Sequence, residues 1–259
     1  MLQALGIVGA PLAGSLIAGF WGKTLGRQLS HGVTILGVLL SFLLALQLGF
    51  EVMSQQVVFE QTVYEWAKVG DIVFQIGFLI DPLTVLMMLV VTFVSLMVHI
   101  YTIEYMADDD GYHRFFSYIS LFTFAMLMLV MSNNFLQLFF GWEGVGLVSY
   151  LLIGFWFKRE SAISANLKAF LINRVGDFGF LLGIAAVYQL FHSFNYTDVF
   201  SSVSSLVDQG ASVTWLCLAL FVGAMGKSAQ IPLHNWLPDS MEGPTPISAL
   251  IHAATMVTA

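Results

Sequence analysis

The stretch from Asn134 to Phe157 reads NFLQLFFGWEGVGLVSYLLIGFWF, and it decides the class of this protein. It contains one charged side chain, Glu143, and as a helix it is long enough to cross the roughly 30 Å hydrocarbon core of a bilayer. Six more apolar runs occur along the chain, at 2–21, 31–50, 82–103, 115–131, 162–191 and 213–231. The sequence therefore predicts an all-α integral membrane protein, a bundle of seven transmembrane helices.

The composition of the chain agrees with this class. Of the 259 residues, 58% are hydrophobic and only 10% are charged, whereas a soluble domain needs more charge to cover its surface. The formal net charge of -7 argues against nucleic acid as a partner, because few cations are available to neutralise phosphates. Cys217 is the only cysteine, which excludes an internal disulfide and a cysteine-based metal site.

One segment between the predicted helices has a different pattern. Residues 55–80 alternate loosely, contain aromatic and β-branched side chains, and include the turn signal Gly70-Asp71. This pattern predicts a small β-hairpin outside the membrane. We therefore divide the chain into two flanking helices (1–50), an extracytoplasmic hairpin segment (51–81) and the main transmembrane bundle (82–259).

The basic residues predict the orientation of the bundle. With seven spans, one side carries Lys68 alone, and the other carries Lys23, Arg27, Arg114, Lys158 and Arg159. By the positive-inside rule the second side is cytoplasmic and the N-terminus is outside. On the outer side, residues 197–208 place Val199, Val203, Leu206 and Val207 on one face, which predicts a short interfacial helix.

The last residues predict another helix. Pro244-Thr245-Pro246 is typical of a helix start, and the apolar run that follows reaches Ala259. About 14 residues of helix extend roughly 21 Å, which is too short to span a bilayer. We therefore expect the chain to be the front part of a longer protein.

Six ionisable side chains at bilayer depth stand out as candidates for a functional site: Glu143, Lys168, Arg174, Asp177, Lys227 and His252. A charge at the centre of a membrane helix costs about 3 kcal/mol, so each needs a reason. Glu143 and Lys227 have no partner of opposite charge on their own helix, which favours an ion or proton path between helices. Arg174 and Asp177 are three residues apart, so mutual neutralisation and a functional role are both open. His252 is either a hydrogen-bonding core residue or a proton relay.

The backbone around Lys227 predicts a broken helix. Gly223 and Gly226 precede the lysine, and Pro232 and Pro238 follow it. We expect Pro232 to free the carbonyl of Ser228 within the helix, since proline has no amide proton. Transporters use broken helices at membrane depth to form ion sites. Burial favours the neutral amine of Lys227 and a nearby carboxylate favours the charged form, so an approaching Glu143 would switch Lys227 between holding and releasing a proton.

Four motifs in order resemble one known family. They are GWEGVGLVSYLLIG at 141–154, KAF with RVGD within 168–177, GKSAQIPL at 226–233, and GPTPISALIHAATMVTA at 243–259. Together they are similar to the L-subunit family of bacterial respiratory complex I (NADH-quinone oxidoreductase), whose antiporter-like members are related to mitochondrial chain 5 and to Mrp antiporter subunits. The resemblance covers essentially the whole chain. It implies two inverted five-helix repeats, of which this chain would hold the flanking helices and most of the first.

The resemblance also implies roles for the buried charges. Glu143 and Lys227 match the pair thought to handle the proton, His252 matches a histidine of the central hydrophilic axis, and Lys168, Arg174 and Asp177 match sixth-helix positions. The implied function is proton translocation in the bacterial inner membrane, coupled to redox chemistry elsewhere. No cofactor would bind this chain, because NADH, FMN, iron–sulfur clusters and quinone would belong to partner subunits.

The implied partners are the lipid bilayer and other membrane subunits of complex I, especially a neighbouring antiporter-like subunit. Two alternatives from other classes remain open. One is an Mrp-type cation/proton antiporter subunit, which shares the fold and the pairing of glutamate with lysine. The other is a structural membrane scaffold in which the charges only hold helices together.

Overall fold

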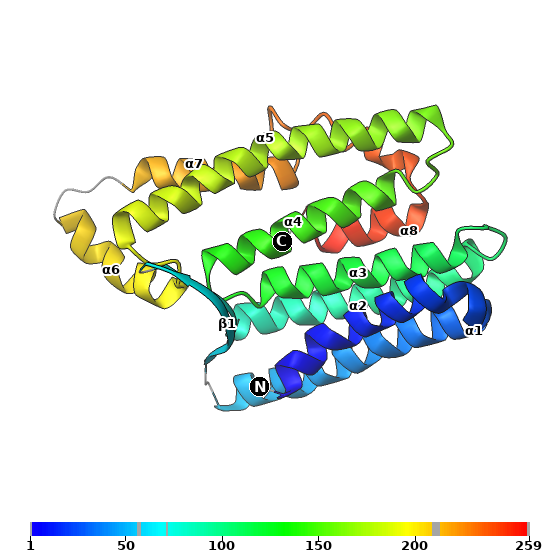
Figure 1. Cartoon of the computed structure of the whole chain (residues 1–259), viewed down its shortest axis with the longest axis horizontal. Coiled ribbons are helices and arrows are strands. Elements are labelled where there is room, and N and C mark those ends of the chain that lie inside the picture. The colour runs from blue at the N-terminus through cyan, green and yellow to red at the C-terminus, as the bar shows by residue number, and fades with distance from the viewer. Residues whose placement is uncertain (1, 56–57, 71, 209–212, 258–259) are drawn as a thin grey trace.

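The chain forms an elongated bundle of roughly antiparallel helices with a β-hairpin across one end (Figure 1). The computed structural model describes residues 2–55, 58–70, 72–208 and 213–257. In chain order the elements are α1 (Leu2–Gln55), β1 (Phe59–Val69), β2 (Ile72–Ile80), α2 (Pro82–Tyr105), α3 (Tyr112–Val130), α4 (Phe135–Ile153), α5 (Glu160–Phe191), α6 (Tyr196–Asp208), α7 (Thr214–Lys227), the 3-10 helix η1 (Asp239–Glu242), α8 (Thr245–Ile247) and the π-helix η2 (Ser248–Ala254).

The helix α1 is two antiparallel arms joined by a sharp turn. Gly26 provides the turn with φ 81° and ψ 171°, a conformation that glycine adopts without steric cost. The arms pack so closely that a Cβ on Gly37 would lie 2.7 Å from the carbonyl oxygen of Ala10. These arms correspond to the predicted spans 2–21 and 31–50. Five helices of the described chain, α1 to α5, are long and apolar enough to cross a membrane, and α7 is a shorter apolar helix.

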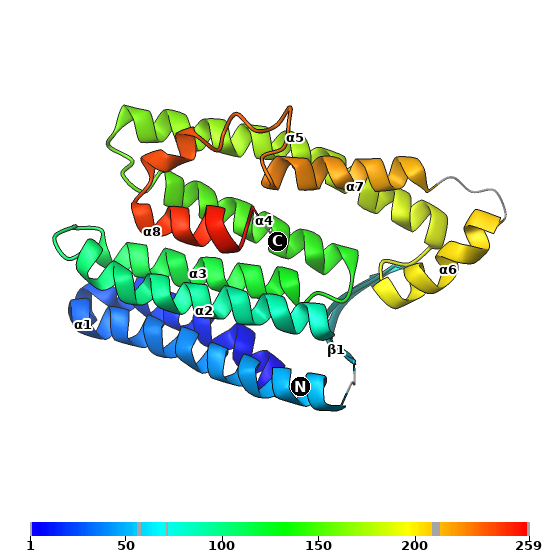
Figure 2. The same cartoon turned by 180° about the vertical axis from the view of Figure 1, so that it is seen from behind.

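The core is centred on α3, which contacts α1, α2 and α4. Its aromatic and aliphatic side chains are among the most completely buried of the described residues, including Phe115, Phe116, Ile119 and Phe122 at 0% exposure. On the other side of α4 lie α5 and α7, so α4 separates the α1–α3 group from the α5–α7 pair (Figures 1 and 2). This layering leaves α4, α5 and α7 to form their own contact region.

The predicted hairpin is present. Strand β1 pairs antiparallel with β2, and Gly70 turns the chain with φ 61°, whereas the predicted turn residue Asp71 lies outside the described residues. The predicted short helix at 197–208 is also present as α6. Val199 on its predicted apolar face is 4% exposed, and the side chains of Leu206 and Val207 lie outside the description.

Two predictions about the C-terminal third need correction. The helix α7 ends at Lys227 instead of continuing to 231, so Pro232 lies beyond the helix and does not free the carbonyl of Ser228 within it. The helix stops because Ala229 has a left-handed backbone conformation, with φ 50°. In addition, the indole Nε1 of Trp236 donates a hydrogen bond of 3.0 Å to the carbonyl oxygen of Gly226. Within the described residues, which end at 257, the predicted last helix runs from Thr245 to Ala254, largely as the π-helix η2.

Candidate functional site

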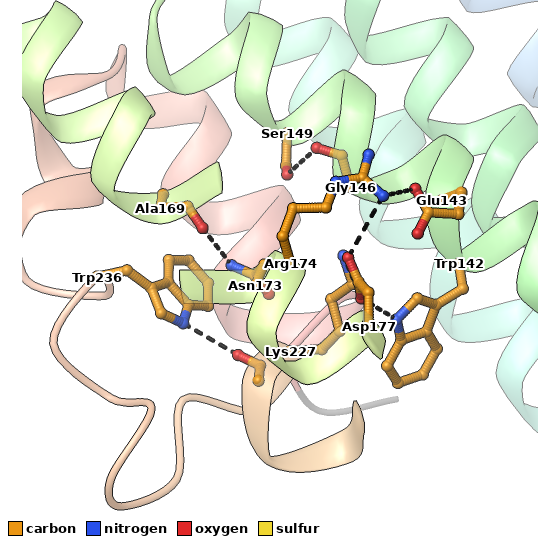
Figure 3. Close-up of polar contacts among 11 residues, drawn as sticks. Trp142, Glu143, Gly146, Ser149, Ala169, Asn173, Arg174, Asp177, Lys227 and Trp236 are labelled. Carbon is orange, nitrogen blue, oxygen red and sulfur yellow. Dashed lines mark hydrogen bonds and ion pairs between the residues drawn. The ribbon is translucent and has the colours of Figure 1, made fainter. Parts of the chain in front are cut away.

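Four buried or half-buried charges from three helices meet in one row (Figure 3). Glu143 from the middle of α4 pairs with Arg174 of α5 through Oε2 and Nη1. The same Nη1 lies 3.7 Å from Oδ2 of Asp177, and Oδ1 of Asp177 lies 3.8 Å from Nζ of Lys227 at the end of α7. The charges therefore alternate along the row, and their sum is zero when Lys227 carries its proton.

Glycines permit this approach of the three helices. A Cβ on Gly176 would lie 3.1 Å from the Cα of Gly226, so α5 and α7 touch backbone to backbone beside Asp177 and Lys227. On α4, a Cβ on Gly146 would lie 2.6 Å from Nζ of Lys227. The lysine ammonium thus occupies the space that a side chain at position 146 would fill.

The row is buried unevenly. Lys227 and Asp177 are 4% and 5% exposed, whereas the side chains of Glu143 and Arg174 are 25% and 39% exposed. Lys227 Nζ and Glu143 Oε1 are buried without a hydrogen-bond partner among the described residues. Leaving such donors and acceptors unsatisfied in an apolar setting costs several kcal/mol. Burial without a partner therefore favours two outcomes for Lys227: the ammonium binds a water molecule, or it loses its proton.

A small cavity adjoins the lysine. Its volume is about 10 Å³, close to what one water molecule requires, and it is lined by Gly146, Ser149, Tyr150, Ala169, Phe170, Asn173, Arg174, Asp177 and Lys227. Polar groups on its wall include the Asn173 side chain, which donates a hydrogen bond of 2.8 Å to the carbonyl oxygen of Ala169. Asp177 and Lys227 both face this space, so a proton-carrying water has a place between them.

Trp142 is a further member of the site that sequence reasoning missed. Its indole Nε1 donates a hydrogen bond of 2.6 Å to Oδ1 of Asp177. Its ring stacks on that of Phe180, with the ring centroids 4.6 Å apart. Lys227 Nζ lies 5.8 Å from the centroid of the Trp142 ring. The available signal was its position: it directly precedes Glu143, and a buried indole usually seeks an acceptor for its N–H.

The remaining predicted residues lie outside the row. Lys168 Nζ pairs with Oδ2 of Asp239 in η1 at 2.6 Å, and both side chains are 44% exposed. His252 Nε2 lies 2.9 Å from Oγ of Ser240, and its Nδ1 has no hydrogen-bond partner among the described residues. Four of the six predicted residues thus form the row, and the other two each contact a residue outside the predicted set.

The contacts refine two sequence hypotheses. The carboxylate within 4 Å of Lys227 is that of Asp177, whereas Glu143 pairs with Arg174. Arg174 and Asp177 are close enough to neutralise one another partly, yet the nearer contact of Arg174 is with Glu143. Glu143 therefore makes no ion pair with Lys227, and Arg174 and Asp177 stand between them in the row.

Two family descriptions match the chain. Residues 132–259 match "NADH:quinone oxidoreductase/Mrp antiporter, TM", and residues 66–116 match "NADH-Ubiquinone oxidoreductase (complex I), chain 5 N-terminus". Among relatives, NADH-quinone oxidoreductase subunit L of Neisseria meningitidis serogroup B is 63% identical over 96% of this chain and 39% of its own length. NADH-ubiquinone oxidoreductase chain 5 of Triticum aestivum is 50% identical over 98% of this chain and 39% of its own length. The chain thus spans about two fifths of the length of these relatives.

Solved structures share the fold. A chain of the Mrp complex from Dietzia sp. DQ12-45-1b aligns with a TM-score of 0.83 at 24% identity, covering 99% of this chain and 27% of that chain. A chain of the membrane-bound sulfane sulfur reductase, an archaeal respiratory membrane complex, aligns with a TM-score of 0.77 at 18% identity, covering 95% of this chain and 37% of that chain.

Proposed function

Because this chain belongs to the family of NADH:quinone oxidoreductase and Mrp antiporter membrane subunits, in the branch of subunit L and chain 5, we propose that it moves protons across the membrane within an NADH-quinone oxidoreductase complex. One observation carries the proposal: the buried ammonium of Lys227 lacks a hydrogen-bond partner among the described residues, yet lies 3.8 Å from Asp177 and beside a cavity for about one water. Such an intramembrane group is suited to loading and releasing a proton.

The alternating row supplies a switch for Lys227. When Arg174 pairs with Glu143, the carboxylate of Asp177 attracts Lys227 and favours its charged form. When Arg174 moves the short distance to Asp177, that attraction weakens and the desolvated ammonium releases its proton. Protonation of Glu143 drives the second arrangement, because a neutral carboxyl no longer holds the guanidinium.

The two outlying pairs extend the path in this proposal. Lys168 and Asp239 are half exposed and therefore suit proton exchange with water. His252 contacts Ser240, its ring centroid lies 5.9 Å from that of Trp236, and it suits onward transfer of a proton from the row. We assign Glu143, Arg174, Asp177, Lys227, Lys168 and His252 to one relay.

Orientation and partners follow from the same proposal. The α1 turn, the α2–α3 loop and the α4–α5 connection share one end of the bundle, opposite the hairpin (Figure 1), and they bring five basic residues to that end. We assign this end to the cytoplasmic side of a bacterial inner membrane, with the N-terminus and the hairpin outside. NADH, FMN, iron–sulfur clusters and quinone would be held by partner subunits, and a neighbouring antiporter-like subunit would flank the bundle.

The experiment uses the full-length chain assembled with its partners in inverted membrane vesicles. NADH oxidation and proton uptake are measured together for Lys227→Ala and for a matched control, Lys68→Ala in the exposed hairpin strand β1. We expect normal assembly on a native gel, with proton uptake per NADH falling for Lys227→Ala alone. Unchanged uptake per NADH in an assembled Lys227→Ala complex would make the lysine structural and favour the scaffold hypothesis.

An Mrp-type antiporter is the second candidate, supported by the TM-score of 0.83 with a chain of an Mrp complex. The two functions differ in the energy source that drives proton movement across the membrane. Proton release driven by a sodium gradient in vesicles without NADH would favour the antiporter. Dependence of proton movement on NADH oxidation, with no response to sodium, supports the redox-coupled function.

A further inference from the structure

A hollow lies at the end of the bundle that carries the α1 turn, and one of its two parts has Lys23 and Arg114 but no carboxylate on its walls. One part, of about 410 Å³, is lined by Gly19, Phe20, Lys23, His113, Arg114, Ser117 and Tyr118, so it lies between α1 and α3. A second part, of about 580 Å³, extends to the α2–α3 loop and to Phe155–Arg159. Both parts share Lys23, His113 and Arg114, and the hollow is therefore continuous across these side chains.

The cations of this hollow lack carboxylate partners. Among the described residues, the ion pairs within 4.0 Å involve Lys168, Arg174 and Lys227, and none involves a cation of the hollow. Three acids, Asp108, Asp109 and Asp110, line the second part of the hollow. Asp109 Oδ1 accepts a hydrogen bond of 2.6 Å from the amide of Gly111, and its Oδ2 accepts one of 2.9 Å from Trp156 Nε1. The first part, between α1 and α3, therefore presents Lys23 and Arg114 without an acid on its own walls, and an external anion can neutralise them there.

Arg114 is held in place and still has an unused donor. Its Nη2 donates a hydrogen bond of 3.0 Å to the carbonyl oxygen of Phe155. Its guanidinium carbon lies 4.5 Å from the ring centroid of Phe155 and 4.9 Å from that of Phe157. Its Nε–H is buried without a partner among the described residues. A guanidinium fixed in this way offers a positive charge at a defined position to a phosphate in the hollow.

The wall beside the cations is apolar and open. Phe20 and Trp21 of α1 are 77% and 57% exposed. Lys23 lies two residues after Trp21, close to the turn at Gly26. Aromatic side chains next to basic ones at a helix end are typical of the membrane–water interface, so acyl chains and headgroups both reach this wall.

We propose that this hollow binds the phosphate of an anionic phospholipid, with Lys23 and Arg114 contacting the headgroup and an acyl chain lying along Phe20. The apolar wall favours a lipid over free phosphate, because inorganic phosphate gains nothing from the exposed aromatics. The site is separate from the proton row, since it shares no residue with the cavity beside Lys227.

The test uses the full-length chain in its assembled complex, reconstituted into nanodiscs with a trace of photoactivatable phosphatidylglycerol or phosphatidylcholine. After illumination, the labelled peptide is identified by mass spectrometry, which distinguishes this site from other lipid contacts. We expect phosphatidylglycerol to label the α1 peptide containing Phe20 and Trp21 in preference to phosphatidylcholine. Lys23→Gln should lower that labelling about five-fold, the factor for about 1 kcal/mol per surface cation.

Controls separate the possible causes. Lys23→Arg should retain the labelling, and Lys68→Gln at the opposite end should leave it unchanged. Because Lys23 is exposed, its substitution does not disturb folding, and Lys158→Gln provides a second variant in the same hollow. Equal labelling by both lipids, or full labelling of Lys23→Gln, would overturn the proposal. Loss of labelling on adding millimolar inorganic phosphate, but not equimolar chloride, would assign the hollow to free phosphate instead. Proton uptake in the same preparations reports the relay independently.

Discussion

Trp142 donates its indole hydrogen bond, at 2.6 Å, to the Oδ1 atom of Asp177, the oxygen that also lies 3.8 Å from Lys227 Nζ. This oxygen therefore accepts a hydrogen bond from one side and faces the ammonium from the other. The second carboxylate oxygen of Asp177, Oδ2, lies 3.7 Å from Nη1 of Arg174. The indole thus fixes which edge of Asp177 each cation meets, and this makes Trp142 a positioning residue for the row.

Replacing Trp142 with phenylalanine tests this role. The variant keeps an aromatic ring for stacking on Phe180 but removes the donor to Asp177. A hydrogen bond to a charged group contributes about 1.5–3 kcal/mol, so the Asp177 carboxylate will be freer to rotate away from Lys227. We expect proton uptake per NADH to fall several-fold in inverted vesicles and its pH profile to shift, while assembly persists.

Trp156→Phe is the matched control, because Trp156 makes the same kind of bond to Asp109 outside the row. Its uptake per NADH should remain at the level of the unmodified complex. An unshifted pH profile for Trp142→Phe, or equal losses in both tryptophan variants, would remove Trp142 from the relay.

The sequence predicted the elements of this site better than their pairing. Helix positions and the buried charges Glu143, Asp177 and Lys227 follow from apolar periodicity and from the cost of burying charge. Which carboxylate meets Lys227 depends on helix packing, here on the contact between Gly176 and Gly226, and one chain's periodicity does not encode it. The end of α7 was misplaced because the capping group, Trp236, is ten residues away from Gly226 in sequence.

Coupling between Glu143 and Lys227 should run through Arg174. Glu143→Gln removes the negative charge that holds Arg174, so the guanidinium will move to Asp177, 3.7 Å away, and compete with Lys227. We expect proton uptake per NADH to fall. Adding Arg174→Gln removes the competitor, so the double variant should recover part of the loss relative to Glu143→Gln alone.

A double-mutant cycle on proton uptake measures this coupling directly. Assembly on native gels must be equal for all four complexes before the rates are compared. Strictly additive losses would show that Glu143 and Arg174 act independently, contrary to the alternating row.

Gly146 offers a way to displace Lys227 without removing it. In Gly146→Ala the new Cβ would lie 2.6 Å from Nζ, the flexible end of the lysine side chain, so Nζ will move while α4 stays in place. We expect near-normal assembly and thermal stability with a clear loss of proton uptake. Gly32→Ala is the control, because a Cβ at that position meets nothing within 4 Å. Full uptake by Gly146→Ala would show that the present position of the ammonium is not required.

Trp236 should act on stability first and on proton transfer second. It is completely buried, and its Nε1 donates 3.0 Å to the carbonyl of Gly226, one residue before Lys227. Trp236→Phe leaves that carbonyl without its indole donor, which costs about 1–3 kcal/mol, and loosens the end of α7. We expect the assembled complex to dissociate at a lower temperature, followed on native gels after heating, with a smaller loss of uptake per NADH than for Trp142→Phe. The reverse order, with uptake lost and thermal stability intact, would instead place Trp236 in the relay beside His252.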